Sequence, residues 1–313
     1  MAHKLVIFDP TSLLGEELVP LLEARLPDLP RAYFHTRPQQ DHLIVEVAGE
    51  AKVVAPLLEL EDLEDAAAVV LTDRPAPKIG EKLEAFFQAN PHRPCLDASG
   101  AGLPNLPPSL APFPQTPQLR LPHPLLLLPA RLLQALAPLA PREAIFTVLA
   151  PVSIFGGEGL DELASQAVAR LSGEKARAEV LPTVLAFDAV PFPEKTPGGL
   201  QEELQALFPS TRITLHPLLT GVFHAVSVFA TFDFGAAPAG RARDLIFSEG
   251  FVAFRGKKPL APSRAAGASS PPVQLLNASP GSLKLWTVGD QLLLGAQVAA
   301  QALEELLSVF PPG

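Results

Sequence analysis

The chain has few of the residues that carry redox or metal chemistry. Its 313 residues include one cysteine, Cys95, and only one methionine, one tryptophan and one tyrosine. A single cysteine excludes an intramolecular disulfide and a cysteine cluster for zinc or iron–sulfur. Because Cys95 lies in the apolar segment Pro94–Ala98, which reads as a buried strand, we interpret it as a small hydrophobic core residue.

Long hydrophobic runs and basic stripes are also missing. Hydrophobic residues make up 48% of the chain, yet no uncharged apolar run reaches the roughly 18–20 residues of a membrane span. The N-terminus passes directly into a strand-like segment, Leu5–Phe8, without the apolar core and cleavage site of a signal peptide. The net charge of −9 disfavours nucleic acid as a partner. We therefore expect a soluble cytoplasmic protein with neither a nucleic acid nor a membrane as its partner.

Proline, in contrast, is abundant, at 36 residues. Prolines that stiffen loops, together with few thermolabile residues, are typical of proteins from thermophiles. A GC-rich genome produces much of the same bias in composition, so the proline content has two explanations, a thermophilic source and a GC-rich genome.

The turn after the first predicted strand is poor in glycine. Leu5–Phe8 reads as a buried strand and Glu16–Ala24 as a helix with leucines on one face. A dinucleotide-binding fold requires glycines between these elements, because the backbone must approach a pyrophosphate at the helix N-terminus. Asp9, Ser12 and Gly15 stand at that spacing. Asp9 adds negative charge where a diphosphate would lie, so the frame of a nucleotide fold is present but its binding chemistry is reduced.

Strand-like and helical segments alternate through the first part of the chain, which predicts a parallel sheet covered by helices. A helix is predicted at Lys78–Ala89, and Gly100–Pro124 is predicted to be a proline-rich crossing loop before a helix at Leu125–Ala137. The other predicted strands of this part are Leu43–Val47, Ala68–Thr72 and Pro94–Ala98.

A second region begins near Glu143 and mixes apolar strands with amphipathic helices. Ala261–Pro272 is predicted to be a loop. The predicted strands are Ala144–Ser153, Ile213–Leu219, His224–Phe234 and Leu283–Val288. The predicted helices are Gly159–Leu171, Gly198–Phe208 and Leu293–Phe310.

Four segments carry a resemblance that covers nearly the whole chain. They are CLDASGAG at Cys95–Gly102, SIFGGEGLDELASQAVARLSG at Ser153–Gly173, LAFDAVPFP at Leu185–Pro193, and LKLWTVGDQLLLGAQ at Leu283–Gln297. In order and spacing they are similar to the V-I-D-L-S-G-A-F-R, SGAGRxGxxEL, IAFNVIPHI and FWVVADNLRKGAA stretches of the aspartate-semialdehyde dehydrogenase family. The chain resembles most the Usg-type paralogues of that family, which keep the fold without its chemistry.

The resemblance implies an α/β fold with two domains. Residues 1–123 and 294–313 are expected to form a Rossmann-like, degenerate NAD(P)-binding domain with a parallel sheet. Residues 124–293 are expected to form an inserted α+β dimerisation and substrate-like domain, similar to the C-terminal domain of glyceraldehyde-phosphate dehydrogenase. The resemblance also implies a homodimer through the sheet face of the second domain, and the apolar strand His224–Phe234 suits such a buried interface.

The family's acyl-transfer chemistry requires residues that this chain lacks at the matching positions. In the family a cysteine thiolate attacks the aldehyde, hydride passes to NADP, and phosphate releases the acyl group. The cysteine of the P-N-C motif corresponds here to Pro124, which has no nucleophilic atom. The glutamine that orients the cysteine corresponds to Ala150, and the acid–base histidine of F-R-G-H-S-E corresponds to Val222.

The positions that bind anions in the family are apolar as well. The substrate-binding arginine corresponds to Leu215 and the phosphate-binding arginine to Leu103. Two charged positions after D-N-L correspond to Leu293 and Leu294. The resulting pocket is less cationic than that of the family, so phosphate and aspartyl groups are expected to be poor ligands.

We therefore predict a catalytically inactive paralogue that acts as a dimeric binding protein for a small molecule or a protein. The alternative is an active NADP-dependent semialdehyde dehydrogenase with relocated catalytic groups, for which His224 is the candidate base. In a third interpretation the chain pairs with the genuine dehydrogenase through the family-like dimer face.

Remnants of a cofactor site are also present. The candidates for binding NADP are Thr11 and Ser12 in the first turn, the Ser99–Gly100 pair, and Arg37, where the family places an arginine against the 2′-phosphate. An exposed surface arginine is the other interpretation of Arg37. A three-histidine metal site is the alternative for three histidines near the expected pocket, but they lack a short spacing such as H-x-x-x-H, so we predict no metal. The three histidines are His123, His216 and His224.

We interpret two further groups of residues, the glycines and acids at 156–162 and a set of phenylalanines, as structural rather than ligand-binding. Gly156 and Gly157 fit a turn before a helix, where Glu158, Asp161 and Glu162 complement the helix dipole. A set of aromatic residues is interpreted as sheet core or subunit interface. These residues are Phe187, Phe192, Phe223, Phe229 and Phe232.

Overall fold

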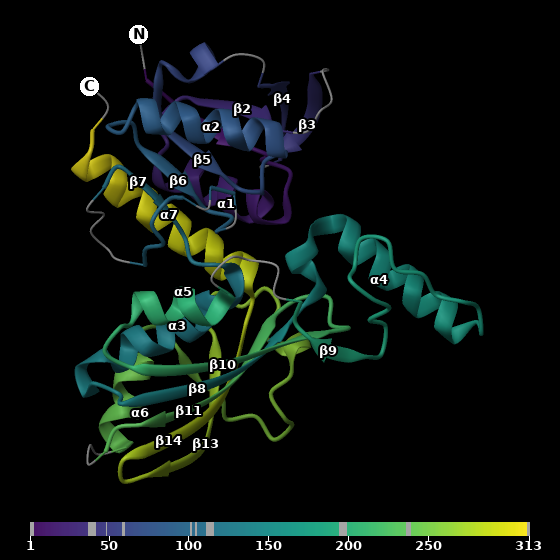
Figure 1. Cartoon of the computed structure of the whole chain (residues 1–313), viewed down its shortest axis with the longest axis vertical. Coiled ribbons are helices and arrows are strands. Elements are labelled where there is room, and N and C mark those ends of the chain that lie inside the picture. Colours follow the sequence, from purple (N-terminus) through teal and green to yellow (C-terminus); the bar gives the residue numbers. More distant parts are fainter. Residues whose placement is uncertain are drawn as a thin grey trace. The chain divides into compact units, whose positions relative to one another are not determined.

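The structure is a computed structural model, and it divides into two compact units (Figure 1). Residues 1–124 with 295–313 form unit 1, and residues 125–294 form unit 2. The described residues are 3–36, 42–47, 49–57, 60–100, 102–103, 105–110, 116–193, 199–235 and 239–311.

Unit 1 contains a seven-stranded sheet in the order β3-β4-β2-β1-β5-β6-β7. All neighbouring strands run parallel except β3 and β4, which form an antiparallel pair at one edge. Because β1 is central, the chain passes to β2 on one side and to β5 on the other, as in a Rossmann fold. The strands are β1 (Lys4–Phe8), β2 (Arg31–His35), β3 (Leu43–Val47), β4 (Glu50–Pro56), β5 (Ala66–Leu71), β6 (Cys95–Asp97) and β7 (Gln118–Arg120). The helices are α1 (Leu13–Arg25), η1 (Leu60–Leu63) and α2 (Pro77–Ala89).

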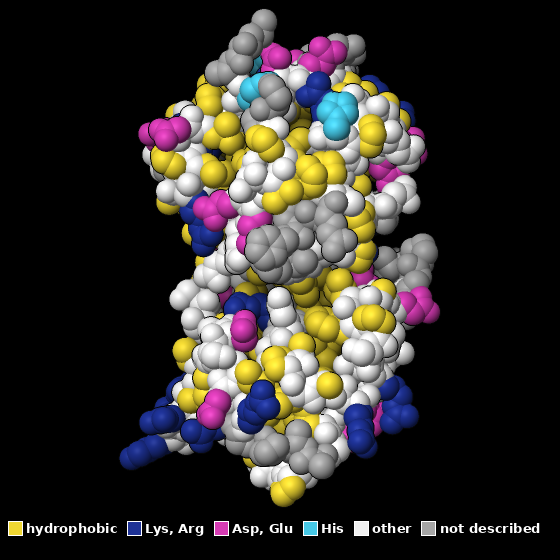
Figure 2. Space-filling model, turned by 90° about the vertical axis from the view of Figure 1, so that its left-hand side faces the viewer, with side chains coloured by type: hydrophobic (Ala, Val, Ile, Leu, Met, Phe, Trp, Pro, Cys, Tyr) yellow, Lys and Arg dark blue, Asp and Glu magenta, His cyan; other side chains and the backbone are white. Residues whose placement is uncertain are grey.

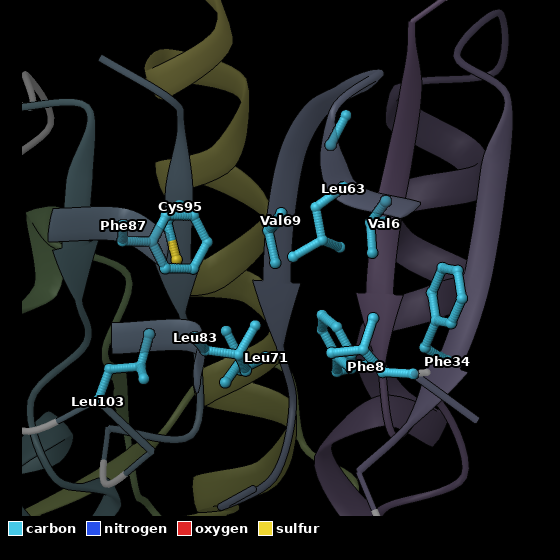
Figure 3. Packing of buried hydrophobic residues seen from close by; sticks show 12 residues of the cluster. Val6, Phe8, Phe34, Leu63, Val69, Leu71, Leu83, Phe87, Cys95 and Leu103 are labelled. Carbon is cyan, nitrogen blue, oxygen red and sulfur yellow. The ribbon is translucent and has the colours of Figure 1, made fainter. Parts of the chain in front are cut away.

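The core of unit 1 packs side chains from the central strands against α2 (Figure 3). Phe8 and Phe34 lie on neighbouring strands with ring centroids 5.8 Å apart. Cys95 is fully buried, and its sulfur lies within this apolar cluster (Figure 3). Burial, together with the nearby Asp97 carboxylate, raises the pKa of the Cys95 thiol well above its ordinary value. The interpretation of Cys95 as a core residue is confirmed.

Helix α7 (Gln291–Val309) begins in unit 2 and continues into unit 1. By length and composition alone it is apolar enough to cross a membrane, a test that core helices of globular proteins also pass. Its buried side chains recur on one face, and Glu304 on its other side forms an ion pair with Arg25 of α1 at 3.0 Å. The buried residues are Leu294, Ala296, Ala299, Ala300, Leu303 and Leu306.

Unit 2 contains a second seven-stranded sheet in the order β12-β13-β14-β11-β8-β10-β9. This sheet is mixed, because β8–β10 and β12–β13 are parallel and the other pairs are antiparallel. Its strands are β8 (Glu143–Ala150), β9 (Ala189–Pro191), β10 (Arg212–Thr220), β11 (Val226–Asp233), β12 (Val252–Ala253), β13 (Pro272–Ser279) and β14 (Ser282–Gly289). Its helices are α3 (Pro124–Leu136), η2 (Ala137–Leu139), η3 (Val152–Phe155), α4 (Gly156–Leu171), α5 (Gly199–Leu207), α6 (Ala239–Ser248) and η4 (Pro262–Arg264).

The two faces of the unit 2 sheet differ. Along β8, residues alternate between buried and half-buried, so one face is covered and the other, which we call the open face, is accessible within the unit. On the covered face Phe146 packs edge-to-face against Phe232, with centroids 5.5 Å apart. On the open face Thr147 lies beside Phe229, and Phe229 lies beside Trp286.

Several elements were not expected from the sequence. The prediction of a loop over Gly100–Pro124 is wrong at Gln118–Arg120, which pair with β6 as strand β7. Helix α1 begins at Leu13 rather than Glu16, because the Ser12 hydroxyl caps it by accepting the Gly15 N–H. Elements without a predicted counterpart include β4, β9, α6, β12 and β13.

Candidate functional site

In unit 1 the residues that follow three adjacent parallel strands are polar and bonded to one another. Asp9 follows β1, Thr36 follows β2 and Thr72 follows β5. The Asp9 carboxylate accepts hydrogen bonds from the Thr36 N–H at 3.1 Å and from the Thr36 hydroxyl at 2.7 Å. We call this pair the Asp9–Thr36 clasp. It lies at the carboxyl end of the sheet, beside the strand order reversal where Rossmann folds bind their ligands.

Asp9 itself is buried and adopts a left-handed backbone conformation with φ of 52°. This conformation favours glycine, and a non-glycine residue in it costs of order 1–3 kcal/mol. The Thr72 hydroxyl lies 2.6 Å from the Asp9 carbonyl oxygen, and the Ser12 N–H donates to that carbonyl at 2.9 Å. Tertiary hydrogen bonds therefore hold the turn in a form that its first residue does not itself prefer.

Ser12 is engaged within the same network. Its hydroxyl oxygen accepts the Gly15 N–H at 3.0 Å and lies 2.8 Å from the Thr72 hydroxyl. Gly15 is required by packing, because a Cβ there would lie 2.5 Å from the Pro10 carbonyl oxygen. Thr11 is exposed in the turn. The assignment of Thr11 and Ser12 to a cofactor stays a prediction, and Arg37 lies outside the described residues.

Ser99 and Gly100 belong to a loop built around a buried carboxylate. Asp97 is fully buried and accepts the Ser99 hydroxyl at 2.6 Å and the N–H groups of Gly102 and Leu103, each at 2.8 Å. Burial raises the pKa of Asp97, while these hydrogen bonds act in the opposite direction. Gly100 has φ of 68°, and a Cβ there would lie 2.6 Å from a carbonyl oxygen. The Ser99–Gly100 segment thus has a structural role in shaping this loop.

Leu103 and Pro124 stand where the resemblance places the phosphate-binding arginine and the nucleophile. Leu103 is buried in the core of unit 1. Pro124 is the first residue of α3, a position where its missing N–H is tolerated. The helix continues with four buried leucines, Leu125–Leu128. Neither position offers a nucleophile or a cation, and the fully buried Cys95 has no route to replace the missing thiol.

In unit 2 the ends of β8 and β10 bring together two other positions taken from the resemblance. Ala150 is buried at the end of β8, and its carbonyl oxygen accepts the Thr220 hydroxyl at 3.0 Å. Just beyond, the Val152 N–H donates to the Val222 carbonyl oxygen at 2.7 Å. We call this region the β8–β10 edge. Ala150 and Val222 have no titratable side chain, so they supply neither an orienting amide nor a base.

His224 is the one titratable residue of the β10–β11 turn, where it is half-buried. It precedes Ala225, which is buried and has φ of 72°. His216 lies instead on the open face in the middle of β10, opposite Thr147, and His123 belongs to unit 1. Among the residues that the structure describes, no three His, Cys, Asp or Glu side chains are grouped to hold a metal ion.

A buried polar pair joins two of the segments that carry the resemblance, Ser153–Gly173 and Leu283–Gln297. Gln291, at the start of α7, donates from Nε2 to the Ser153 hydroxyl at 2.6 Å, and both residues are buried. Asp290 caps α7 by accepting the N–H of Leu292 at 3.1 Å. The neighbouring Leu293 is half-buried and Leu294 is buried. Leu215, at the position of the substrate arginine, is buried on the covered face beside Phe146.

The interpretation of the acids on α4 requires a correction. The helix begins at Gly156 rather than Gly159, so the prediction of a turn at Gly156 and Gly157 is wrong. Glu158, expected before the helix, lies in its first turn, and Glu162 lies well inside it. The Glu162 carboxylate accepts N–H groups from residues 179–181 at 2.6–3.2 Å. Although burial acts to raise it, these hydrogen bonds hold the pKa of Glu162 below its ordinary value. Glu162 therefore ties a connecting segment to the helix, and the helix-dipole interpretation is wrong for it.

The aromatic residues have different environments. Phe232 is part of the sheet core, as predicted, and Phe229 lies on the open face. Phe187 and Phe223, in contrast, are 66% and 43% exposed within the unit. Phe187 has φ of 68°, so this exposed ring is held on a left-handed backbone.

The chain is similar in structure to solved proteins, although its sequence matches no family model. No family model matches the chain, and no curated protein sequence matches it. The structure of aspartate semialdehyde dehydrogenase II from Vibrio cholerae, complexed with ASA, is 19% identical, covers 99% of each chain and has a TM-score of 0.79. A probable aspartate-semialdehyde dehydrogenase from Pseudomonas aeruginosa is 21% identical, with 98% of this chain and 99% of that chain covered and a TM-score of 0.79. The enzyme from Francisella tularensis is 13% identical, with 98% and 100% covered and a TM-score of 0.80.

These similarities establish the fold. The chain has a Rossmann-like domain with an inserted α+β domain of the glyceraldehyde-phosphate-dehydrogenase type, as the resemblance implied. Sequence analysis missed Thr36 and Thr72, which bond to Asp9 from the ends of β2 and β5. A threonine at the carboxyl end of a buried strand was the available signal for both.

Proposed function

We propose that the protein is a catalytically inactive relative of the aspartate-semialdehyde dehydrogenases and functions by binding a small molecule or a protein. The observation that carries the proposal is Pro124 at the position of the family's cysteine. A thioester requires a thiolate, and the chain's single thiol is fully buried with a raised pKa. Ala150 and Val222 at the orienting and acid–base positions support the same conclusion.

The proposal extends to the cofactor. The Asp9–Thr36 clasp puts a carboxylate where a dinucleotide would present its negative charge, and like charges repel strongly in a shielded site. The Ser12 hydroxyl of the turn is already bonded to the Thr72 hydroxyl and to the Gly15 N–H. We therefore propose that NADP and NAD bind weakly or not at all, and that the ligand is less anionic than the family's substrates.

The test combines turnover with calorimetry on the purified protein. L-aspartate semialdehyde, phosphate and NADP are supplied together, and formation of reduced nicotinamide is followed by absorbance. We expect no turnover and no heat of binding at millimolar NADP or NAD. Turnover above the rate without protein contradicts the proposed inactivity, whereas tight NADP binding without turnover contradicts only the proposed loss of the cofactor.

The alternative function is an active NADP-dependent dehydrogenase with relocated groups, and His224 at the β10–β11 turn is the observation that favours it. If turnover is found, substitution His224→Ala tests this alternative. Loss of turnover in the variant supports His224 as the base, and an unchanged rate removes it from the mechanism.

We further propose a cytoplasmic homodimer formed through the open face of unit 2. Apolar side chains of three neighbouring strands lie on that face, among them Leu149, Phe229 and Trp286. Phe229→Glu places a charge there and is expected to shift the sedimentation coefficient from dimer to monomer. A complex with the genuine dehydrogenase, detected by co-purification, would instead support pairing between the two proteins.

A further inference from the structure

The charges of this acidic chain are unevenly divided. The residues of unit 1 include 19 Asp and Glu against 10 Lys and Arg, whereas unit 2 has 14 of each kind. Within unit 2 the segment Gly250–Gly289 contains five Lys and Arg and no Asp or Glu. Lys and Arg side chains stand out from the surface of this unit (Figure 2). A segment of one sign in a chain of the opposite net charge creates a local field that favours an anionic partner.

Four of these five cations lie on the connection between β12 and β13, and all four are exposed. None of the ion pairs recorded among the described residues involves them. We call them the basic loop; its members are Arg255, Lys257, Lys258 and Arg264.

The backbone of the basic loop is fixed to the sheet beneath it. Leu260 and Ala265 are buried in an apolar cluster that Trp286 borders. The Trp286 indole N–H donates to the Leu260 carbonyl oxygen at 3.0 Å, and the Gly267 N–H donates to the Asp290 carboxylate at 2.8 Å. Because these contacts hold the loop, a partner needs to order only the cationic side chains, which lowers the entropic cost of binding.

We propose that the basic loop binds an acidic extended segment of a partner protein. Carboxylates form charge-assisted hydrogen bonds with Lys and Arg. An acidic segment concentrates its charge over a few residues, as the basic loop does. An RNA duplex or an anionic membrane carries its charge over a much larger surface. Such a surface is bound through many cations at once, whereas the basic loop offers four.

The chain provides its own reporter for the test. Trp286 is the only tryptophan and its indole N–H donates to the Leu260 carbonyl oxygen of the loop, so we expect its fluorescence to change when a ligand binds there. The full-length protein is titrated with an acetylated octaglutamate peptide at about 50 mM NaCl, where screening is weak. We expect saturable binding that weakens about tenfold on raising NaCl to about 300 mM.

Variants then locate the site. Lys257→Gln with Lys258→Gln is expected to weaken peptide binding about tenfold, and Lys257→Arg with Lys258→Arg is expected to preserve it. The matched control is Lys175→Gln with Arg177→Gln, which removes two exposed cations elsewhere in unit 2 and is expected to leave the affinity unchanged. Thermal unfolding establishes that each variant is folded.

Three outcomes would overturn the proposal. The first is no binding of the peptide at millimolar concentration. The second is an equal loss of affinity in the control variant, which makes the attraction a property of overall charge. The third is tighter binding of duplex RNA or of phosphatidylserine vesicles than of the peptide, which assigns the basic loop to one of those partners.

Discussion

The β1–α1 turn of unit 1 and the β8–β10 edge of unit 2 depart from the family's pattern in different ways. In the turn, polar groups are retained but bond to one another, with Asp9 held by Thr36 and Ser12 by Thr72. At the β8–β10 edge the functional positions hold Ala150 and Val222, which have no polar side-chain atom. The positions that the resemblance assigns to function thus hold internally bonded polar groups in one region and apolar side chains in the other, while the fold is the same in both.

Because polar groups in unit 1 are bonded to one another, we predict that the stability of this unit depends on its buried hydrogen bonds. Asp97→Ala leaves the Ser99 hydroxyl and three N–H groups without their acceptor and is expected to lower the free energy of unfolding by about 3 kcal/mol. Urea denaturation measures the change. Asp28→Ala, at an exposed turn, is the control and is expected to change stability by less than about 0.5 kcal/mol. An equal effect of the two substitutions would contradict the role of Asp97.

At the start of α3 the proposed inactivity rests on the identity of the side chain at position 124, and we expect a thiol placed there to be accessible. Wild-type protein is expected to react with Ellman's reagent only after denaturation, because its one thiol is buried. Pro124→Cys is expected to add one reactive thiol per native chain, since a thiol at a helix N-terminus has a lowered pKa. An unreactive native variant would show instead that this helix start is inaccessible.

The Asp9–Thr36 clasp gives a third prediction. Asp9→Gly removes the carboxylate and supplies a residue suited to φ of 52°, so NADP affinity is expected to rise by about tenfold or more. Calorimetry compares the NADP affinity of Asp9→Gly with that of Thr36→Val. The Thr36→Val variant removes the hydroxyl that donates to Asp9 but keeps the Asp9 carboxylate, so its NADP affinity is expected to equal that of the wild type. Equal affinities of wild type and Asp9→Gly would mean that the carboxylate does not exclude the dinucleotide.

The smallest expected effect concerns Glu162 in unit 2. Its pKa is lowered in the folded state, so its stabilising contribution is present above the unfolded-state pKa and is lost as pH falls through the lowered value. Hydrogen exchange at Val180 and Leu181, corrected for intrinsic pH dependence, is expected to accelerate over that acidic range. In Glu162→Gln the same amides are expected to exchange faster at neutral pH and to lose this pH response.

The fold class was predictable from the sequence because it depends on patterns that extend over many residues. The strand at Leu5–Phe8 and the helix at Lys78–Ala89 are present close to their predicted bounds. Strand β7 was not predictable, since three residues show no periodicity and gain their hydrogen bonds only by pairing with β6. Strand β13 lacks a regular alternation of buried residues and pairs with β14 across a register shift.

For the candidate site, too, some features were predictable from the sequence and others were not. The identity of residues such as Pro124 and Val222 is a property of the sequence, and a side chain without a nucleophile or a titratable group excludes the corresponding chemistry wherever it lies. The partners of Asp9 are not such a property, because Thr36 is 27 residues away and Thr72 is 63 residues away. Glu162 likewise suits a helix dipole in the sequence, and only the structure shows that it holds residues 179–181.

The sequence by itself determined the layered α/β architecture, the burial of Cys95 and which side chains stand at positions such as 124 and 222, since hydrophobic periodicity and side-chain chemistry are local properties. Only the tertiary structure decided that Asp9 bonds to Thr36, that Asp97 organises the Ser99–Gly100 loop, and that the basic loop is fixed against Trp286. Each of these depends on hydrogen bonds between residues distant in the chain, which form only when the sheets bring their strands together.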